Sequence, residues 1–160
     1  MATHKRRIYV DTSVFGAAFA PGFAEASNRL LDEVRGGRVE AVISGTVRAE
    51  IAPAPEHVRN LFAEIVALAE VAEPTDEALQ LRDAYLAAGV VTSKWEADAL
   101  HVALATVAGC SAIVSWNFKH IVHLEKAPAY NGVNLARGYH QLAICTPPEV
   151  VQYEDEDDDQ

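Results

Sequence analysis

Three carboxylates and one amide lie at positions where separate segments of the chain can meet. Asp11 directly follows the β-branched and aromatic run 8–10, which is typical of a buried strand. Glu50 lies in a short predicted helix, Asp98 in the second turn of an almost wholly apolar helix, and Asn117 after a later strand. In an open parallel sheet, ligands bind outside the carboxyl ends of the strands, where the following helices begin. We therefore expect all four side chains to face one cleft.

The proximity of three carboxylates has a chemical consequence. Two carboxylates about 4 Å apart repel by about 4 kcal/mol at an effective dielectric constant of 20. Some of Asp11, Glu50 and Asp98 are therefore protonated, or a cation neutralises them. Oxygen ligands without histidine or cysteine suit Mg²⁺ or Mn²⁺, and these ions bind phosphates and activate water. The pattern indicates hydrolysis of a phosphodiester bond.

Basic residues flank these acids along the chain. Arg48, Lys94 and Lys119 are candidates for contacts with backbone phosphates at the rim of an acidic site. A further basic run, 5–7, precedes the first predicted strand. Ordinary surface charge is the alternative interpretation for each of these residues.

The elements that must position the four residues alternate between strands and helices. A capping box of Ser93 and Glu96 is expected to open the apolar helix, and Asn117 to cap a short helix over 118–124, whereas 126–141 reads as irregular. Alternation predicts an α/β fold with a parallel sheet and helices on both faces. Strands are expected at 6–11, 39–43, 69–72, 112–115 and 142–145, and helices at 23–35, 46–52, 56–69, 76–88 and from the capping box to about 108.

Composition narrows the class of protein. The 160 residues carry a formal net charge of −10, and 50% of them are hydrophobic. One domain over 1–151 is expected, with order ending at Pro147-Pro148 and a disordered acidic tail over 152–160. The acidic balance argues against a simple phosphate-binding module with a basic patch. No apolar run is long enough for a membrane span or a signal peptide, so we expect a cytoplasmic protein without a membrane partner. The two cysteines lie beside apolar residues and are expected to be buried and reduced.

Four short motifs occur in order along the chain. They are Ile8-Tyr9-Val10-Asp11-Thr12-Ser13, Ser44-Gly45-Thr46-Val47-Arg48-Ala49-Glu50-Ile51, Glu96-Ala97-Asp98-Ala99-Leu100-His101-Val102-Ala103 and Ile113-Val114-Ser115-Trp116-Asn117-Phe118. Their order and spacing resemble those of PIN-domain nucleases, and within that family most those of the toxins of bacterial VapC-like toxin–antitoxin pairs. The segment from Gly138 to Val150 also resembles the close of one PIN subgroup, so that the resemblance covers the chain up to about Val151.

The resemblance implies a fold and an activity. The fold is a three-layer α/β/α arrangement with a central, mostly parallel sheet of about five strands. The activity is that of a metal-dependent endoribonuclease, in which metal-activated water hydrolyses RNA. Asp11 and Asp98 would be the main metal ligands, Glu50 would orient the metal or the water, and Thr12 or Ser13 would support the site. Members of this family are often homodimers, and an antitoxin protein often silences them.

Asn117 departs from the family pattern, because many members carry an acid at this fourth catalytic position. Its amide oxygen can hold a water or a metal but brings no charge, so that a second metal would bind more weakly. A non-catalytic PIN-fold module that binds RNA or a protein is therefore the main alternative. A phosphoaspartyl protein is a further one, with Asp11 as nucleophile or metal ligand, although it lacks a second acid at Ser13 and only Lys119 offers a late lysine.

Overall fold

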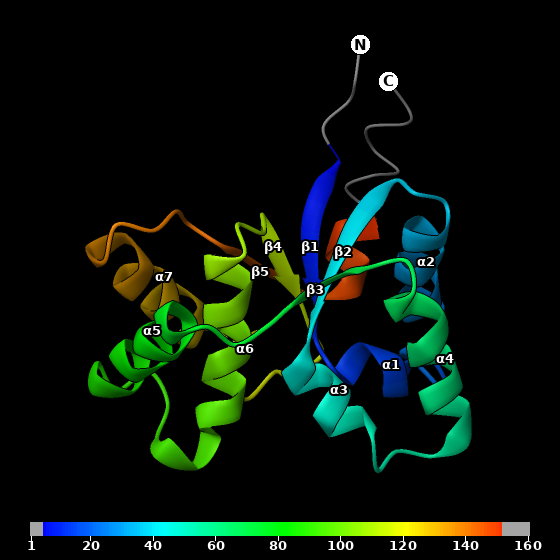
Figure 1. The fold of residues 1–160 in the computed structure, drawn as a ribbon, viewed down its shortest axis with the longest axis horizontal. Helices are drawn as coiled ribbons and strands as arrows, with labels where there is room; N and C mark the ends of the chain where they lie inside the picture. Colours follow the sequence, from blue (N-terminus) through cyan, green and yellow to red (C-terminus); the bar gives the residue numbers. More distant parts are fainter. Residues whose placement is uncertain (1–4, 152–160) are drawn as a thin grey trace.

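Five parallel strands form the sheet at the centre of the molecule (Figure 1). In the computed structural model, which describes residues 5–151, every neighbouring pair of strands is parallel. The spatial order is β3-β2-β1-β4-β5, which confirms the predicted fold class. The expected acidic tail, 152–160, lies outside the described residues. The strands are β1 (Arg6–Val10), β2 (Val39–Ser44), β3 (Glu70–Ala72), β4 (Ala112–Val114) and β5 (Ala143–Cys145).

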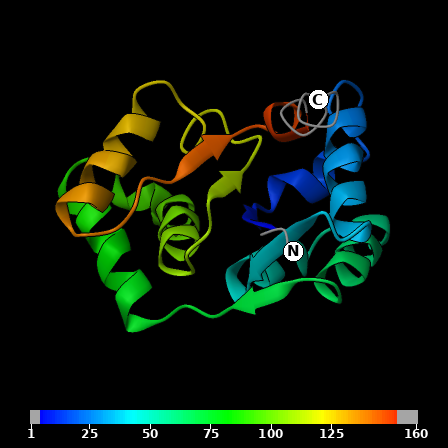
Figure 2. The same ribbon diagram turned by 90° about the horizontal axis from the view of Figure 1, so that it is seen from above.

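Helices cover both faces of this sheet, which gives three layers (Figures 1 and 2). One face carries α1 (Ser13–Ala17), α2 (Ala24–Arg35) and α4 (Glu56–Val66). The other carries α5 (Asp76–Ala87), α6 (Glu96–Val107) and α7 (Lys126–Ala136). The short helix α3 (Gly45–Ile51) follows β2 at the carboxyl edge of the sheet, at the lower side of Figure 1. Because both faces are covered, residues 8–10 of β1 and 41–43 of β2 are continuous apolar, buried runs rather than alternating ones.

The strand order reverses direction at β1, and this reversal creates the place for a site. The chain proceeds outward from β1 to β2 and β3, then returns to the other side of β1 for β4 and β5. Tyr9 pairs with Val42 on one side and with Ile113 on the other. Beyond the strand, the Asp11 N–H still donates to the carbonyl oxygen of Val114 at 3.1 Å. Such a reversal is where open α/β sheets bind ligands, because the connections after the two central strands leave in opposite directions.

Helix α6 is the most deeply buried helix on its face of the sheet. Ala99, Val102, Ala103 and Ala105 have no exposed surface, and these small side chains allow close packing beside β4. The helix ends at Gly109, whose φ of +75° is a left-handed conformation that favours glycine. The predicted burial and the predicted end of this helix are both confirmed.

The predicted capping box is wrong. Ser93–Trp95 forms a 3₁₀ turn, η1, ahead of α6, and no side chain caps either element. Ser93 therefore lies a turn too early to reach the first backbone N–H groups of α6, and Glu96 is an exposed first helical residue. Residues 118–122 form hydrogen-bonded turns rather than the short helix predicted over 118–124, although Asn117 caps them as expected.

Two further segments are more ordered than the sequence suggests. Residues 126–136 were expected to be irregular but form α7. The helix forms because Tyr130 and Asn134 are fully buried against the neighbouring helices. After Pro147-Pro148, where order was expected to end, 147–151 forms a helical turn whose Val150 and Val151 join the core. Over 5–151, no helix is long and apolar enough to cross a membrane. Cys110 and Cys145 are both free.

Candidate active site

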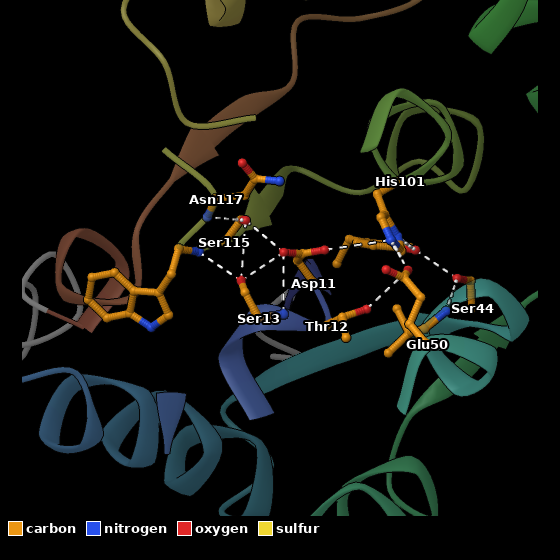
Figure 3. Close-up of polar contacts among 11 residues, drawn as sticks. Asp11, Thr12, Ser13, Ser44, Glu50, His101, Ser115 and Asn117 are labelled. Carbon is orange, nitrogen blue, oxygen red and sulfur yellow. Dashed lines mark hydrogen bonds and ion pairs between the residues drawn. The ribbon is translucent and has the colours of Figure 1, made fainter. Parts of the chain in front are cut away.

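The Asp11 carboxylate lies at the junction of β1 and β4 and is only 4% exposed. The hydroxyls of Ser13 and Ser115 each donate to its Oδ2 at 2.7 Å (Figure 3). The Ser13 N–H also points at this oxygen, at 3.4 Å. Oδ2 is therefore committed to protein hydrogen bonds, and the orientation of the carboxylate is fixed. Its other oxygen, Oδ1, lies 3.7 Å from Nε2 of His101.

The two serine hydroxyls also tie the loop after β4 to the loop after β1. Ser13 Oγ accepts the Trp116 N–H at 2.9 Å, and Ser115 Oγ accepts the Asn117 N–H at 2.9 Å. Each hydroxyl thus receives one hydrogen bond and gives one to Asp11. Ser13 lies where a supporting residue was expected. Ser115 was missed by sequence reasoning, although a hydroxyl immediately after the strand and two residues before Asn117 is a visible signal.

Glu50 reaches the site from α3, and its side chain is 38% exposed. Its Oε1 contacts Nε2 of His101, and the Thr12 hydroxyl donates to the same oxygen at 3.3 Å. His101 lies three residues after Asp98 on α6 and is 1% exposed. Glu50 was expected to need a cation or a proton because other carboxylates lie near it. The structure instead gives it a histidine partner, which sequence reasoning did not place in the site.

His101 is held from its other side by a buried polar chain. Its Nδ1 lies 2.8 Å from the Tyr9 hydroxyl, which in turn lies 2.7 Å from Ser44 Oγ. Burial alone lowers the pKa of His101, but the hydrogen bond with Glu50 and the charges of Asp11, Glu50 and Asp98 outweigh it, so that the net shift is upward. The surroundings of the His101 imidazole therefore favour its protonated, positively charged form.

Asp98 is half-buried at the start of α6. Desolvation raises the pKa of its carboxyl, and the negative charge of Asp11 raises it further. The Asn117 side chain, by hydrogen bonding, and the two histidines His120 and His101 act in the opposite direction without cancelling the shift. Asp98 and Asp11 are thus close enough to repel each other in a partly desolvated place.

Asn117 performs two structural tasks beside these acids. Its side-chain Oδ1 accepts the His120 N–H at 3.0 Å, which caps the turn that follows. It also stabilises the ionised form of Asp98. The structure therefore brings Asp11, Asp98 and Asn117 together as expected, and it joins Glu50 to them through His101.

Comparison with known proteins identifies the family. Residues 7–119 match the family model described as PIN domain. The chain belongs to the PIN-domain family. No curated protein matches it significantly. Among solved structures, this PIN domain is similar to VapBC2 from Rickettsia felis. In that crystal structure, VapBC2 is bound to a DNA fragment from its own promoter. The TM-score is 0.55 at 15% identity, over 88% of this chain and 98% of that one. It is also similar to FitAcB from Neisseria gonorrhoeae, with a TM-score of 0.57 at 14% identity, over 88% of this chain and 97% of that one.

The donor set of this PIN domain fits a hard divalent cation in part. The negative charges of Asp11 and Asp98 are close enough for Asp11 to raise the pKa of Asp98, and a cation between the two carboxylates would relieve this repulsion. Glu50 does not join them, because its Oε1 is directed at His101. Accordingly, no group of three or more histidine, cysteine, aspartate or glutamate side chains within 5–151 is arranged to hold a metal ion. The residues present thus offer two carboxylates to a cation rather than a preformed cluster of three.

Four basic residues of this PIN domain lie towards opposite ends of the parallel strands. Arg48, Lys94 and Lys119 are exposed on the segments that carry Glu50, Asp98 and Asn117. Arg7 lies instead at the amino-terminal part of β1. It pairs with Glu40 at 2.9 Å and donates to the carbonyl of Ala108 at 2.8 Å. Arg7 is therefore a structural residue, whereas the other three are exposed on segments at the carboxyl edge.

Proposed function

We propose that this PIN domain is a Mg²⁺- or Mn²⁺-dependent endoribonuclease. PIN domains are generally nucleases, and the chain belongs to that family. The observation that carries the proposal is the pairing of Asp11 and Asp98 at the reversal of strand order. There, burial and the charge of Asp11 together raise the pKa of Asp98. Two partly desolvated carboxylates of like charge are stabilised by a bound cation, and they have little structural use without one.

Each residue of the site has a role in this proposal. Asp11 Oδ1 and Asp98 would hold the cation, which supplies a Lewis acid for the phosphate and lowers the pKa of a bound water. Ser13 and Ser115 fix the orientation of Asp11 through hydrogen bonds to Oδ2, which leaves Oδ1 as the oxygen for the cation. Glu50, held by His101 and Thr12, orients the attacking water through its remaining carboxylate oxygen. Asn117 supports Asp98 and adds no charge of its own.

RNA is the proposed substrate, and three exposed basic residues are its proposed phosphate contacts. Arg48, Lys94 and Lys119 lie on α3, on η1 and in the turn after Asn117. All three segments follow or precede the residues of the site at the carboxyl edge of the sheet. A backbone phosphate bound there would place the neighbouring phosphodiester near Asp11 and Asp98.

We further propose that the protein is a cytoplasmic toxin that an antitoxin partner restrains, and that it forms a homodimer. Support comes from the likeness to VapBC2 and FitAcB over 88% of the chain. Induced expression is expected to arrest growth, and the Asp98→Asn variant at equal expression is expected not to. Sedimentation equilibrium tests the dimer. Growth arrest by the Asp98→Asn variant would contradict a toxicity that depends on catalysis.

A cleavage assay tests the enzymatic proposal directly. The purified protein is expected to cut RNA with Mn²⁺ or Mg²⁺ and to stop when a chelator is added, and the Asp98→Asn variant is expected to lose at least a hundredfold in rate. Asp83→Asn is the matched control, because Asp83 is an exposed aspartate that pairs with Arg82 on α5. Cleavage by Asp98→Asn at the wild-type rate, with contaminating nuclease excluded, would overturn the proposal.

A non-catalytic module that binds RNA or a protein remains the second candidate. Two observations favour it, namely the neutral Asn117 and the lack, over the described chain, of a preformed group of three metal-binding side chains. Calorimetric titration with Mn²⁺ separates the two functions. Binding that Asp11→Asn abolishes supports the nuclease, and no binding at millimolar Mn²⁺ supports the module.

A further inference from the structure

Two stacked rings, of which the Trp95 indole is exposed, adjoin the carboxylate site. The indole of Trp95 lies on the imidazole of His120, with ring centroids 4.1 Å apart and planes inclined by 23°. Trp95 is nevertheless 38% exposed, so that solvent still reaches part of this residue. We propose that Trp95 and His120 form a stacking platform for an unpaired nucleobase of an RNA substrate. This inference rests on the proposed function and specifies how that site would bind RNA.

The platform lies next to the proposed chemistry. Trp95 is the last residue before α6 and lies three positions before Asp98. His120 donates its backbone N–H to Asn117 Oδ1, and it is close enough to Asp98 to lower that residue's pKa. A base stacked on Trp95 therefore belongs to a nucleotide close to Asp98 and Asn117.

The His120 ring is placed at a cost in stability. Both of its nitrogens are buried, and within the described part of the chain neither has a hydrogen-bond partner. An unsatisfied buried polar atom is unfavourable, and in a native structure it often marks a functional position. The visible benefit is a flat ring that holds the Trp95 indole parallel to it. A held indole loses less side-chain entropy when a base stacks on it.

Lys94 provides a second interaction at the same place. Its ammonium lies 5.1 Å from the centroid of the Trp95 ring. An exposed cation–π contact contributes about 0.5–1 kcal/mol, whereas a stacked base contributes about 1–3 kcal/mol. A base can therefore displace the ammonium from the ring. Lys94 is then free to pair with the phosphate of the same nucleotide.

The charge of the chain favours a base over other uses of this platform. The sequence has 23 acidic and 13 basic residues, so that attraction to phosphates alone provides little affinity. Stacking does not depend on net charge and accepts any base. In an A-form duplex the bases are already stacked on each other, so the platform selects single-stranded or looped RNA.

Binding without catalysis tests the platform. Fluorescence anisotropy in a chelator measures the affinity for a short labelled oligoribonucleotide and for its duplex. Trp95→Ala is expected to weaken single-strand binding about tenfold, and Trp95→Phe by no more than about threefold. Phe19→Ala is the matched control, because Phe19 is 48% exposed but packs on His57. It is expected to bind like the wild type.

Trp95 fluorescence gives a second readout. Trp116→Phe leaves Trp95 as the one tryptophan of the chain, and single-stranded RNA is expected to quench its emission. Unchanged single-strand affinity in Trp95→Ala overturns the platform, as does an equal loss for duplex. So does a loss of self-association in that variant with RNA affinity intact, which would make the rings a protein contact. If RNA binding depends on Trp95 but the wild type does not cleave RNA in Mn²⁺, the nuclease proposal alone is overturned. If wild type and Trp95→Ala bind and cleave RNA equally, the platform alone is overturned.

Discussion

The two oxygens of the Asp11 carboxylate have different surroundings. Oδ2 accepts hydrogen bonds from both serine hydroxyls, whereas Oδ1 lies 3.7 Å from Nε2 of His101. A ligand for the site therefore meets an oxygen whose direction is already fixed. Loss of a hydrogen bond that orients a ligating carboxylate typically reduces metal affinity or activity about 10- to 100-fold.

Ser115→Ala is expected to reduce cleavage about 10- to 100-fold while the fold is retained. The substitution removes one donor to Asp11 and leaves the Asn117 N–H without its acceptor. Ser111→Ala is the control, because the Ser111 hydroxyl donates to the carbonyl of Arg7 near the amino end of β4. Metal-dependent cleavage rates of both variants provide the measurement, and equal rates in the two variants would contradict a role for Ser115 in the site.

Asp98→Asn is expected to raise the thermal stability of the metal-free protein at pH 7. Because the pKa of Asp98 is raised in the folded state, that state binds more protons than the unfolded one, and stability falls as pH rises above the ordinary aspartate pKa of 3.8. The variant removes this penalty, which is small because Asp98 is partly solvated. Melting in a chelator measures the effect, with Asp83→Asn as control.

The pH dependence makes that prediction sharper. Wild type and Asp98→Asn are expected to converge well below the ordinary aspartate pKa, where Asp98 is protonated in both states, and to separate as pH rises. The raised pKa of His101 acts in the same direction, because its stabilising charge is lost above its folded pKa. A metal-free variant that melts below the wild type at pH 7 would show that the carboxylate stabilises the fold.

At the scale of elements, β1, β4 and α6 form the frame of the site. Asp11 and Ser115 follow neighbouring strands, and the first turn of α6 brings Asp98 to the same edge. Parallel pairing and alternation with helices were predictable, because the apolar runs of β1 and β2 and the caps and glycines of the helices are local signals. The meeting of Asp11, Asp98 and Asn117 followed from that topology.

Features that depend on tertiary contacts were not predictable in the same way. Helix α7 contains Pro128 and Gly132, which lower helix propensity, and it forms because its buried face packs against α5 and α6. His101 looked like one more residue in an apolar helix, and only the position of α3 reveals its contact with Glu50. The Ser93-Glu96 pattern matched a capping box. In the structure, Ser93–Trp95 instead forms a 3₁₀ turn that leaves Trp95 exposed.

Asn134 joins the three helices on one face of the sheet. It is fully buried, its Oδ1 accepts the Tyr85 hydroxyl at 2.5 Å, and its Nδ2 donates to Thr106 Oγ1 at 3.2 Å. Asn134→Ala is expected to reduce the free energy of unfolding by about 2–4 kcal/mol, because it leaves a cavity and an unsatisfied tyrosine hydroxyl. Asn60→Ala, at an exposed position on α4, is the control in urea unfolding. Equal losses in the two variants would contradict the importance of this network.

At the scale of the whole molecule, the net charge of −10 restricts how RNA can bind. Arg7 forms ion pairs at the amino-terminal part of β1, and Arg35 pairs with Glu64 and Asp32. The basic residues proposed to contact RNA are Arg48, Lys94 and Lys119, which are exposed at the carboxyl edge. A protein that contacts few phosphates must obtain its remaining affinity from contacts that salt does not screen.

The salt dependence of RNA affinity measures how many phosphates are contacted. Three contacts at about −0.7 each give a slope of about −2 for log affinity against log salt concentration on a single strand. Lys119→Gln is expected to reduce the steepness by about 0.7, whereas Arg82→Gln, which removes a partner of Asp83 on α5, is expected to leave it unchanged. Trp95→Ala is expected to lower the affinity at every salt concentration without changing the slope, because stacking releases no counterions. Anisotropy titrations in a chelator separate the two contributions. An equal change of slope in Lys119→Gln and Arg82→Gln would show that RNA binding depends on the overall charge of the protein rather than on this edge of the sheet.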